Sequence, residues 1–155
     1  MSQLILLIGL PGSGKSTLAN KLLAECPQKR LISTDAIRGQ LFGNEDFQGS
    51  WVLIWQEIKR QFQETVDNKS DAIYDATNAQ RRSRKEIITL AKEIGFTQIK
   101  GIWINTPIDV CILRNKSRLR VVPEEVISRM HRRLEDAPPH LDDGFDELTC
   151  LDLVV

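Results

Sequence analysis

Short apolar runs alternate along the chain with segments whose apolar residues recur at helical spacing. Five runs have the length and composition of buried strands, at residues 4–8, 30–32, 71–74, 97–104 and 148–155. Six segments between them have the spacing of amphipathic helices, at residues 15–26, 35–41, 51–62, 82–94, 107–114 and 123–134. Strands that alternate with helices indicate a parallel sheet covered by helices on both faces. We therefore expect an α/β fold with about five strands, formed by residues 1–155 as a single domain.

One of these helical stripes contains two tryptophans. Trp51, Ile54, Trp55, Ile58 and Phe62 follow one another at intervals of three or four residues, so they share one face of a helix. A face of this kind usually packs against the core. Tryptophans that remain exposed can instead form a surface on which nucleic acid bases stack. The pattern leaves both interpretations open.

The segment between the first strand and the first helix has the sequence GLPGSGKST. Gly9, Gly14, Lys15 and Ser16 match the pattern G-x-x-x-x-G-K-[ST]. Its glycines let backbone N–H groups surround phosphate oxygens, and the N-terminus of the following helix adds partial positive charge. In this pattern the lysine reaches the β- and γ-phosphates of a nucleoside triphosphate and the hydroxyl ligates Mg²⁺. The contacts expected for ATP with Mg²⁺ are Gly9, Pro11, Gly12, Ser13, Gly14, Lys15, Ser16 and Thr17.

Two aspartates follow strands of the expected sheet. Asp35 comes just after the second strand, and Asp75 ends the third. Ligands of parallel sheets bind beyond the carboxyl ends of the strands, so both carboxylates should lie near the phosphates. We expect Asp75 to hold Mg²⁺ together with Ser16, and Asp35 to take a proton from an attacking hydroxyl group. Asp35 is also suited to capping the next helix, whose Arg38 could bind a phosphate of the acceptor or lie in solvent.

A basic segment, residues 115–122, lies between two expected helices. It contains Lys116, Arg118 and Arg120. Phosphoryl transfer needs positive charge around the equatorial oxygens in the transition state, and a flexible arginine segment that closes over the site supplies it. We expect this segment to be such a lid, although an ordinary solvated loop can have the same composition.

More basic residues gather where the helix at 82–94 begins. They are Arg81, Arg82, Arg84 and Lys85. Positive charge at a helix N-terminus opposes the helix dipole, so helix stability does not explain the arrangement. Contact with a polyanionic substrate and a solvated helix face both fit these residues.

Composition and charge limit the classes of protein. The 155 residues include 21 basic and 21 acidic ones, so no net charge steers the whole protein to DNA or to a membrane. The charges are nevertheless sorted, with 13 basic and 5 acidic residues at positions 81–133 and 7 acidic and no basic ones thereafter. The three cysteines form no C-x-x-C pair, and neither a signal peptide nor a membrane-spanning run is recognisable. We expect a cytoplasmic protein.

Five motifs together resemble a known family. They are GLPGSGKST, Asp35 with Arg38, DATN at 75–78, R-N-x-x-R-x-R-x-V-P at 114–123 and GFDEL at 144–148. This combination resembles the kinase domain of polynucleotide 5′-hydroxyl kinases, the phage-type and animal group of kinase/phosphatases within the P-loop kinases. The D-x-D-x-[TV] motif of their phosphatase domain is absent from the sequence. In the phage-type enzymes the acid directly precedes Thr-Asn, whereas here Ala76 intervenes.

The resemblance implies ATP-dependent phosphorylation of the 5′-hydroxyl end of DNA or RNA by a P-loop kinase fold. It implies that Asp35 is the general base, that Arg38 contacts a phosphate of the acceptor, and that Arg118 is the catalytic lid arginine on the donor phosphates. Lys15 would share the neutralisation of the transferring group. Further expected contacts are Arg114 and Arg120 to the nucleotide and Thr77, Asn78 and Arg82 to the substrate.

Proteins with other functions can have the same residues for binding the nucleoside triphosphate. A kinase for a sugar, a nucleoside or an antibiotic differs in needing a closed acceptor pocket rather than an open basic groove. An ATP hydrolase or nucleotide-dependent switch needs a residue that positions water, and none is evident. A nucleotide-binding module without catalysis leaves Asp35 and Arg118 without a purpose.

Overall fold

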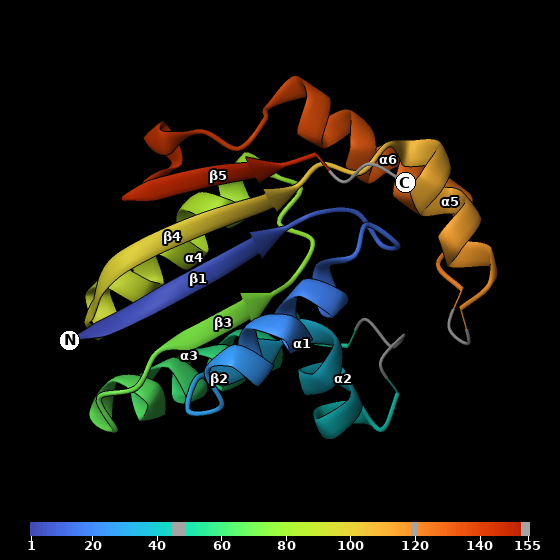
Figure 1. Ribbon diagram of the computed structural model, residues 1–155. Coiled ribbons are helices and arrows are strands. Elements are labelled where there is room, and N and C mark those ends of the chain that lie inside the picture. The colour runs from blue at the N-terminus through green and yellow to red at the C-terminus, as the bar shows by residue number, and fades with distance from the viewer. Residues whose placement is uncertain (45–48, 119–120, 153–155) are drawn as a thin grey trace.

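The computed structural model of the protein describes residues 1–44, 49–118 and 121–152. Its strands form one parallel sheet in the order β2-β3-β1-β4-β5 (Figure 1). The strands are β1 (Ser2–Ile8), β2 (Arg30–Ser33), β3 (Ala72–Asp75), β4 (Phe96–Ile104) and β5 (Glu147–Leu151). The expected α/β fold with a five-stranded parallel sheet is confirmed.

Helices connect the strands and cover both faces of the sheet. They are α1 (Lys15–Glu25), α2 (Thr34–Phe42), α3 (Trp51–Asp67), α4 (Arg81–Ile94), α5 (Ile108–Lys116) and α6 (Glu124–Asp136), with the short 3₁₀ helix η1 (Leu141–Asp143). α1 lies on one face, and α3 and α4 lie side by side on the other (Figure 1). α5 and α6 lie beyond the carboxyl ends of the strands, where the expected ligand site is.

The central strand β1 is buried on both sides. Leu4, Leu6 and Ile8 point into the core beneath α3 and α4, whereas Ile5 and Leu7 belong to the smaller core beneath α1. Successive side chains of a strand point to opposite faces, and here both faces are covered. This double burial explains why the sequence of β1 is continuously apolar instead of alternating.

The helical stripe of α3 divides between core and surface. Ile54, Ile58 and Phe62 are fully buried, and the Phe62 ring meets the rings of Tyr74 and Phe96 edge to face at centroid distances of 5.8 and 5.3 Å. The core interpretation is therefore confirmed for these three members of the stripe. The two tryptophans lie at the end of α3 that faces the ligand site.

The last strand is shorter than its apolar run predicts. β5 pairs with β4 up to the partners Ile104 and Leu151, where β4 itself ends. Without a neighbouring strand the ladder stops, whatever the sequence beyond it favours. Residues 153–155, which the sequence also assigns to this strand, lie outside the described residues.

Arg84 differs from both sequence interpretations, because it lies neither in solvent nor in the substrate cavity. Its side chain is fully buried, and its Nε donates to Oδ2 of Asp143 at 2.8 Å. Its two terminal nitrogens donate to the backbone carbonyls of Asn78, Ala79 and Ala137 at 2.7–3.1 Å. A buried guanidinium needs partners of this kind, and these partners come from loops that the local sequence pattern does not connect.

Candidate active site

The loop between β1 and α1 has the shape of an anion cradle. Gly12 has φ +82°, and a Cβ atom there would lie 2.5 Å from the carbonyl oxygen of Cys111. Gly14 has φ +104° and occupies the N-cap position of α1, where it has no side chain that could accept from the first backbone N–H groups. These N–H groups therefore keep their hydrogen-bonding capacity for a ligand at the positive end of the helix.

Hydrogen bonds fix the backbone of this loop from outside. The N–H of Gly9 donates to the carbonyl of Thr77 at 3.2 Å, and the Thr106 hydroxyl donates to the carbonyl of Ser13 at 2.7 Å. The Ser13 hydroxyl is itself buried and has no hydrogen-bond partner among the described residues. A rigid loop with unsatisfied donors suits the phosphate groups of ATP.

Asp75 binds the two reactive side chains of the loop. The Ser16 hydroxyl donates to Oδ2 of Asp75 at 3.2 Å, and Nζ of Lys15 lies 3.7 Å from Oδ1. A hydroxyl and a carboxylate are oxygen ligands of the kind that Mg²⁺ prefers. The described residues contain no cluster of three or more His, Cys, Asp or Glu that could hold a metal alone. The donor set therefore fits a Mg²⁺ ion that takes its other ligands from phosphate and water.

Asp35 and Arg38 lie in the first turns of α2. Ser33 is the N-cap of this helix, because its Oγ accepts from the N–H of Ala36 at 3.3 Å, so the capping interpretation of Asp35 is wrong. Nη1 of Arg38 donates to Oδ1 of Asp35 at 3.2 Å. Nε of Arg38 is buried and lacks a partner in the described part of the chain. The pair thus joins a carboxylate to an incompletely satisfied guanidinium.

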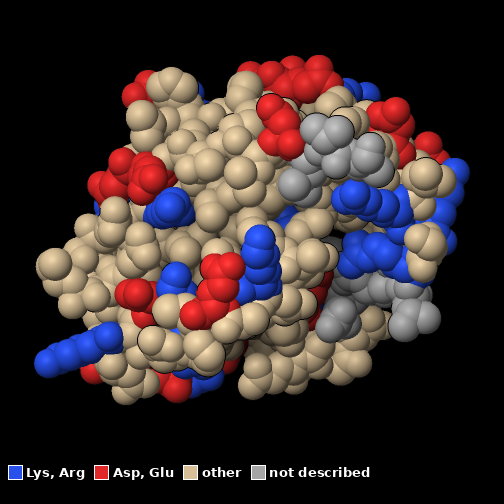
Figure 2. Space-filling view, viewed as in Figure 1, with Lys and Arg blue, Asp and Glu red and all other residues tan. Residues whose placement is uncertain are grey.

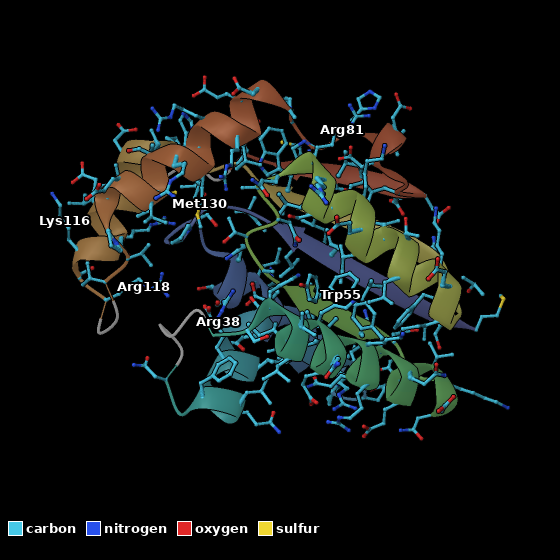
Figure 3. The ribbon with its side chains drawn as sticks, turned by 180° about the vertical axis from the view of Figure 1, so that it is seen from behind. Arg38, Trp55, Arg81, Lys116, Arg118 and Met130 are labelled. Carbon is cyan, nitrogen blue, oxygen red and sulfur yellow. The ribbon has the colours of Figure 1, made fainter. Side chains whose placement is uncertain are left out.

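A cavity of about 1350 Å³ brings these groups together. Its wall includes the phosphate loop, Asp75, the Asp35–Arg38 pair and the arginines of α5 and the lid segment. Figure 3 shows Arg38, Arg118, Met130 and Trp55 around this space. The expected site residues that line it are Pro11, Gly12, Gly14, Lys15, Ser16, Thr17, Asp35, Arg38, Asp75, Thr77, Asn78, Arg114 and Arg118.

Basic side chains border one side of this cavity. Arg114, in the last turn of α5, lines the cavity, whereas Lys116 of the same turn is exposed and is not among the described residues that line it. Lys and Arg side chains gather over this end of α5 in Figure 2. Buried Asn115 donates through Nδ2 to the carbonyl of Val122 at 2.6 Å and accepts from its N–H at 3.0 Å. These two bonds join the ends of segment 115–122, whose Arg118 is exposed. Arg120 lies outside the described residues.

Two expected substrate contacts have other partners. The Asn78 amide donates to the carbonyls of Leu7 and Ala76 at 2.7 and 3.2 Å, so it ties the loop after β3 to β1 although the residue lines the cavity. The Arg82 side chain is 88% exposed and donates to Glu86 at 2.9 Å. Arg82 is not among the described residues that line the cavity.

One wall of the cavity was not expected from the sequence. Val126, Met130 and Arg133 of α6 line it, at intervals of four and three residues. That spacing on the helix was the available signal, but it does not show which neighbour the face meets.

Burial removes two groups from the acid–base chemistry of the site. It raises the pKa of the Tyr74 phenol, an effect that the charge of Arg38 opposes and that of Asp75 increases. It also raises the pKa of the Cys111 thiol beneath the loop, more than the charge of Arg114 lowers it. Both groups are therefore neutral near pH 7, and the charges of the cavity come from its lysine, arginine, aspartate and glutamate side chains.

Residues 4–137 of the chain match the family described as AAA domain. The chain belongs to this family. The AAA domain is 29% identical over 145 residues to the L-seryl-tRNA(Sec) kinase of Methanococcus maripaludis, a match that covers 85% of this chain and 52% of that protein. The chain thus spans about half the length of that relative.

Solved structures share the fold of this AAA domain. A chain of the Pnkp1/Rnl/Hen1 RNA repair complex matches 94% of this chain and 46% of its own length, with a TM-score of 0.80 and 22% identity. The match to a fungal RNA kinase covers 100% of this chain and 76% of that one, with a TM-score of 0.69 and 21% identity. The match to a gluconokinase from Sinorhizobium meliloti 1021 covers 97% of this chain and 82% of that one, with a TM-score of 0.64 and 16% identity. The expected P-loop kinase fold is confirmed.

Within the described ranges, the AAA domain has no helix that combines the length and the apolar character needed to cross a bilayer.

Proposed function

We propose that this AAA domain is a phosphotransferase that uses ATP and Mg²⁺ and moves the γ-phosphate to the 5′-hydroxyl end of a polynucleotide. One observation carries the proposal: the Asp35–Arg38 pair lines the same cavity as Lys15, Ser16 and Asp75. A carboxylate opposite a phosphate loop can accept a proton, which a module that only binds nucleotide does not need. The cavity therefore contains a donor half and an acceptor half.

The donor half uses the phosphate loop. The backbone N–H groups and the start of α1 bind the phosphate oxygens, and Lys15 neutralises charge on the transferring group. Bound Mg²⁺ would add further positive charge to the phosphates, held by the Ser16 hydroxyl with help from Asp75. Arg118, together with Arg114 and Arg120, would close over the donor from the lid side.

The acceptor half activates a hydroxyl group. Asp35 accepts the proton as the hydroxyl oxygen forms its bond to the γ-phosphorus, while the bond between that phosphorus and the β–γ bridging oxygen breaks and ADP leaves. Arg38 orients the carboxylate through its 3.2 Å hydrogen bond. An acceptor phosphate beside Arg38 would complete the hydrogen bonding of the guanidinium.

The names of similar proteins favour a nucleic acid acceptor. A curated relative is named as a kinase of seryl-tRNA, and two structures of the same fold are an RNA kinase and part of an RNA repair complex. These similarities support an acceptor hydroxyl carried by RNA or DNA.

A transfer assay tests the acceptor class. The protein is incubated with γ-labelled ATP, Mg²⁺ and, separately, DNA and RNA oligonucleotides with 5′-hydroxyl ends, seryl-tRNA, nucleosides and sugars including gluconate. We expect label on the 5′ ends of the oligonucleotides. Label only on seryl-tRNA, a nucleoside or a sugar would overturn the polynucleotide assignment and keep the phosphotransferase; ATP hydrolysis without transfer would overturn both.

An Asp35→Asn substitution tests the base. We expect kcat to fall about 100-fold or more because the amide cannot accept the proton. ATP affinity should remain nearly unchanged, since Lys15 and the loop bind the donor. Asp67→Asn is the matched control and should keep full activity, because Asp67 is exposed at the end of α3, just before β3 begins. An Asp35→Asn enzyme with near-normal turnover would contradict the assignment.

A further inference from the structure

A second, shallow hollow of about 370 Å³ lies between α3 and α4 beside the catalytic cavity, and Trp55 and Glu86 line both spaces. The other residues of the hollow are Lys59, Lys85, Thr89, Leu90 and Glu93. The α3–α4 groove, defined by these residues and Trp51, therefore leads away from the acceptor half along the outer surface of two neighbouring helices.

We propose that the acceptor strand leaves the catalytic cavity through the α3–α4 groove, with bases against Trp51 and Trp55 and phosphates beside Lys59 and Lys85. The inference rests on the proposed function, because it supplies a path for the strand whose 5′ end would lie at Asp35. It adds residues that determine which acceptors bind well.

Trp51 is exposed although it is a large apolar residue. Its side chain is 49% exposed at the start of α3, and it lines the cavity. The rings of Trp51 and Trp55 lie 6.1 Å apart with their planes tilted by 43°, so together they present a bent aromatic surface. The core does not need this surface, because Ile54 and Ile58 already anchor the helix. Unpaired bases bind to exposed aromatic rings of this kind.

Three of the groove residues form a row along α3. Trp51, Trp55 and Lys59 are four residues apart, so they follow one another by about 6 Å per step on one side of the helix. Lys85 faces the same groove from α4. Figure 3 shows Trp55 where α3 and α4 meet, across the cavity from Arg118. The order from the cavity outward is thus aromatic first and cationic second.

When its ion pairs are taken into account, the α3–α4 groove has a net positive charge, which suits a polyanion. Glu86 is paired with Arg82 at 2.9 Å. Lys59 and Lys85 then face Glu93, which leaves a surplus of one positive charge. Such a weak field favours contact through stacking together with a few phosphates, as in single-strand binding. Arg82, expected from the sequence to contact the substrate, instead lies beside the groove, where it pairs with Glu86.

A charge-matched pair of double variants tests the lysines. Lys59→Gln with Lys85→Gln should raise the KM for oligonucleotides of six or more nucleotides about tenfold. The KM for a nucleoside 3′-phosphate and the kcat should not change. The salt dependence of the oligonucleotide KM should weaken by about 1.4 in logarithmic slope, because two phosphate contacts on a single strand are lost. The control is Lys29→Gln with Lys69→Gln, in the loops before β2 and β3 at the amino ends of the strands. It removes the same charge and should leave all three quantities unchanged.

Substitutions of Trp51 test the aromatic surface. Trp51→Leu keeps an apolar side chain but loses the ring, and should raise the KM for oligonucleotides about tenfold. Trp51→Phe keeps a ring and should restore most of the affinity. Thermal unfolding of each variant shows whether it is folded, and the comparison of leucine with phenylalanine separates stacking from simple loss of contact.

Three results would overturn the inference, the first together with the proposed function and the other two without it. If the wild-type protein phosphorylates no oligonucleotide, the proposed function fails and the strand path fails with it. If it phosphorylates oligonucleotides but its KM is the same for a nucleoside 3′-phosphate and a hexamer, the proposed function stands and the α3–α4 groove does not bind the strand. Equal behaviour of the Lys59/Lys85 and Lys29/Lys69 variants leads to the same conclusion.

Discussion

At the scale of single residues, Asp75 connects the parts of the donor site. It is the last residue of β3, and its two oxygens face Ser16 and Lys15 at 3.2 and 3.7 Å. The additional residue after it, Ala76, lies in a loop that Asn78 closes with φ +52° and a hydrogen bond to the carbonyl of Leu7. Because the loop after β3 accommodates Ala76, the carboxylate of Asp75 still points at the phosphate loop.

Cys111 gives a prediction at this scale. Its thiol is fully buried, and burial raises its pKa, so very little thiolate exists at pH 8. We expect iodoacetamide at pH 8 to leave the buried Cys111 unmodified in the native protein, while Cys150, whose pKa is also raised by burial and by the charge of Asp152, still reacts because it is exposed. Mass spectrometry of digested protein measures both, and labelling in 8 M urea is the control in which Cys111 becomes reactive. Rapid native labelling of Cys111 would show that the loop above it opens.

At the scale of elements, the phosphate loop depends on its packing against α5. Gly12 lies against the backbone of Cys111, with space for a hydrogen atom but not for a methyl group. The N-terminal half of the loop is therefore shaped by a helix about 100 residues later in the sequence. This contact adds to the local requirement for positive φ at Gly12.

Gly12→Ala should destabilise the protein by about 2 kcal/mol or more and abolish ATP binding, because φ strain and a clash with the Cys111 carbonyl act together. Gly43→Ala is the matched control, since Gly43 also has positive φ but no atom of the described residues within 4 Å of its Cβ position. It should cost only about 1 kcal/mol and leave binding intact. Urea unfolding and calorimetry measure the two quantities. Equal losses of stability in the two variants would contradict the role of the contact.

A second feature at this scale is the ion pairing that attaches α4 to η1. Asp143 of η1 binds both Arg84 and Arg81, at 2.8 and 3.1 Å, and accepts from the N–H of His140. Arg84 at the same time holds the carbonyls of the loop that carries Asn78. One buried ion pair thus connects the loop after β3 to the segment after α6.

Removing the Asp143 charge should therefore be costly. Asp143→Asn leaves the guanidinium of Arg84 buried without its counter-ion, and we expect a loss of about 3 kcal/mol in the free energy of unfolding. Arg81→Gln breaks the half-exposed arm of the same network and should cost less than about 1 kcal/mol. Denaturant unfolding at pH 7 compares the two variants. A larger loss for Arg81→Gln than for Asp143→Asn would contradict this order.

At the scale of the whole molecule, the site is an assembly of distant segments. The cavity takes its wall from the loops after β1 and β3 and from each of the α-helices α1 to α6. These elements meet only because parallel strands direct their carboxyl ends to one edge of the sheet. Ligand binding should therefore stabilise the whole fold.

We expect Mg²⁺ and ATP at about 100 times Kd to stabilise the protein by about 2.7 kcal/mol. Asp35→Asn should keep this shift in the midpoint of thermal unfolding, because Asp35 belongs to the acceptor half. Asp75→Asn should lose the part that depends on Mg²⁺, and EDTA should remove the same part from the wild type. Thermal unfolding with ATP, with and without Mg²⁺, measures all cases. A Mg²⁺-dependent shift that survives in Asp75→Asn would contradict its role as a metal ligand.

The sequence predicted the fold class and the phosphate loop well, since strands, helices and the G-x-x-x-x-G-K-[ST] loop follow from local spacing. The sequence did not predict which residues are buried when several polar residues lie in one cluster. Arg82 and Arg84 are two residues apart in one basic cluster, yet one is 88% exposed and the other is fully buried. The difference comes from Asp143, 59 residues beyond Arg84.

The sequence by itself determined that five strands alternate with helices and that a phosphate loop follows the first strand, because both depend on neighbours within a few residues. Only the tertiary structure decided that Arg84 is a buried ion-pair partner and that Trp51 faces the cavity. Burial and charge pairing arise between segments far apart in the chain, so the order of strands in the sheet had to be known first.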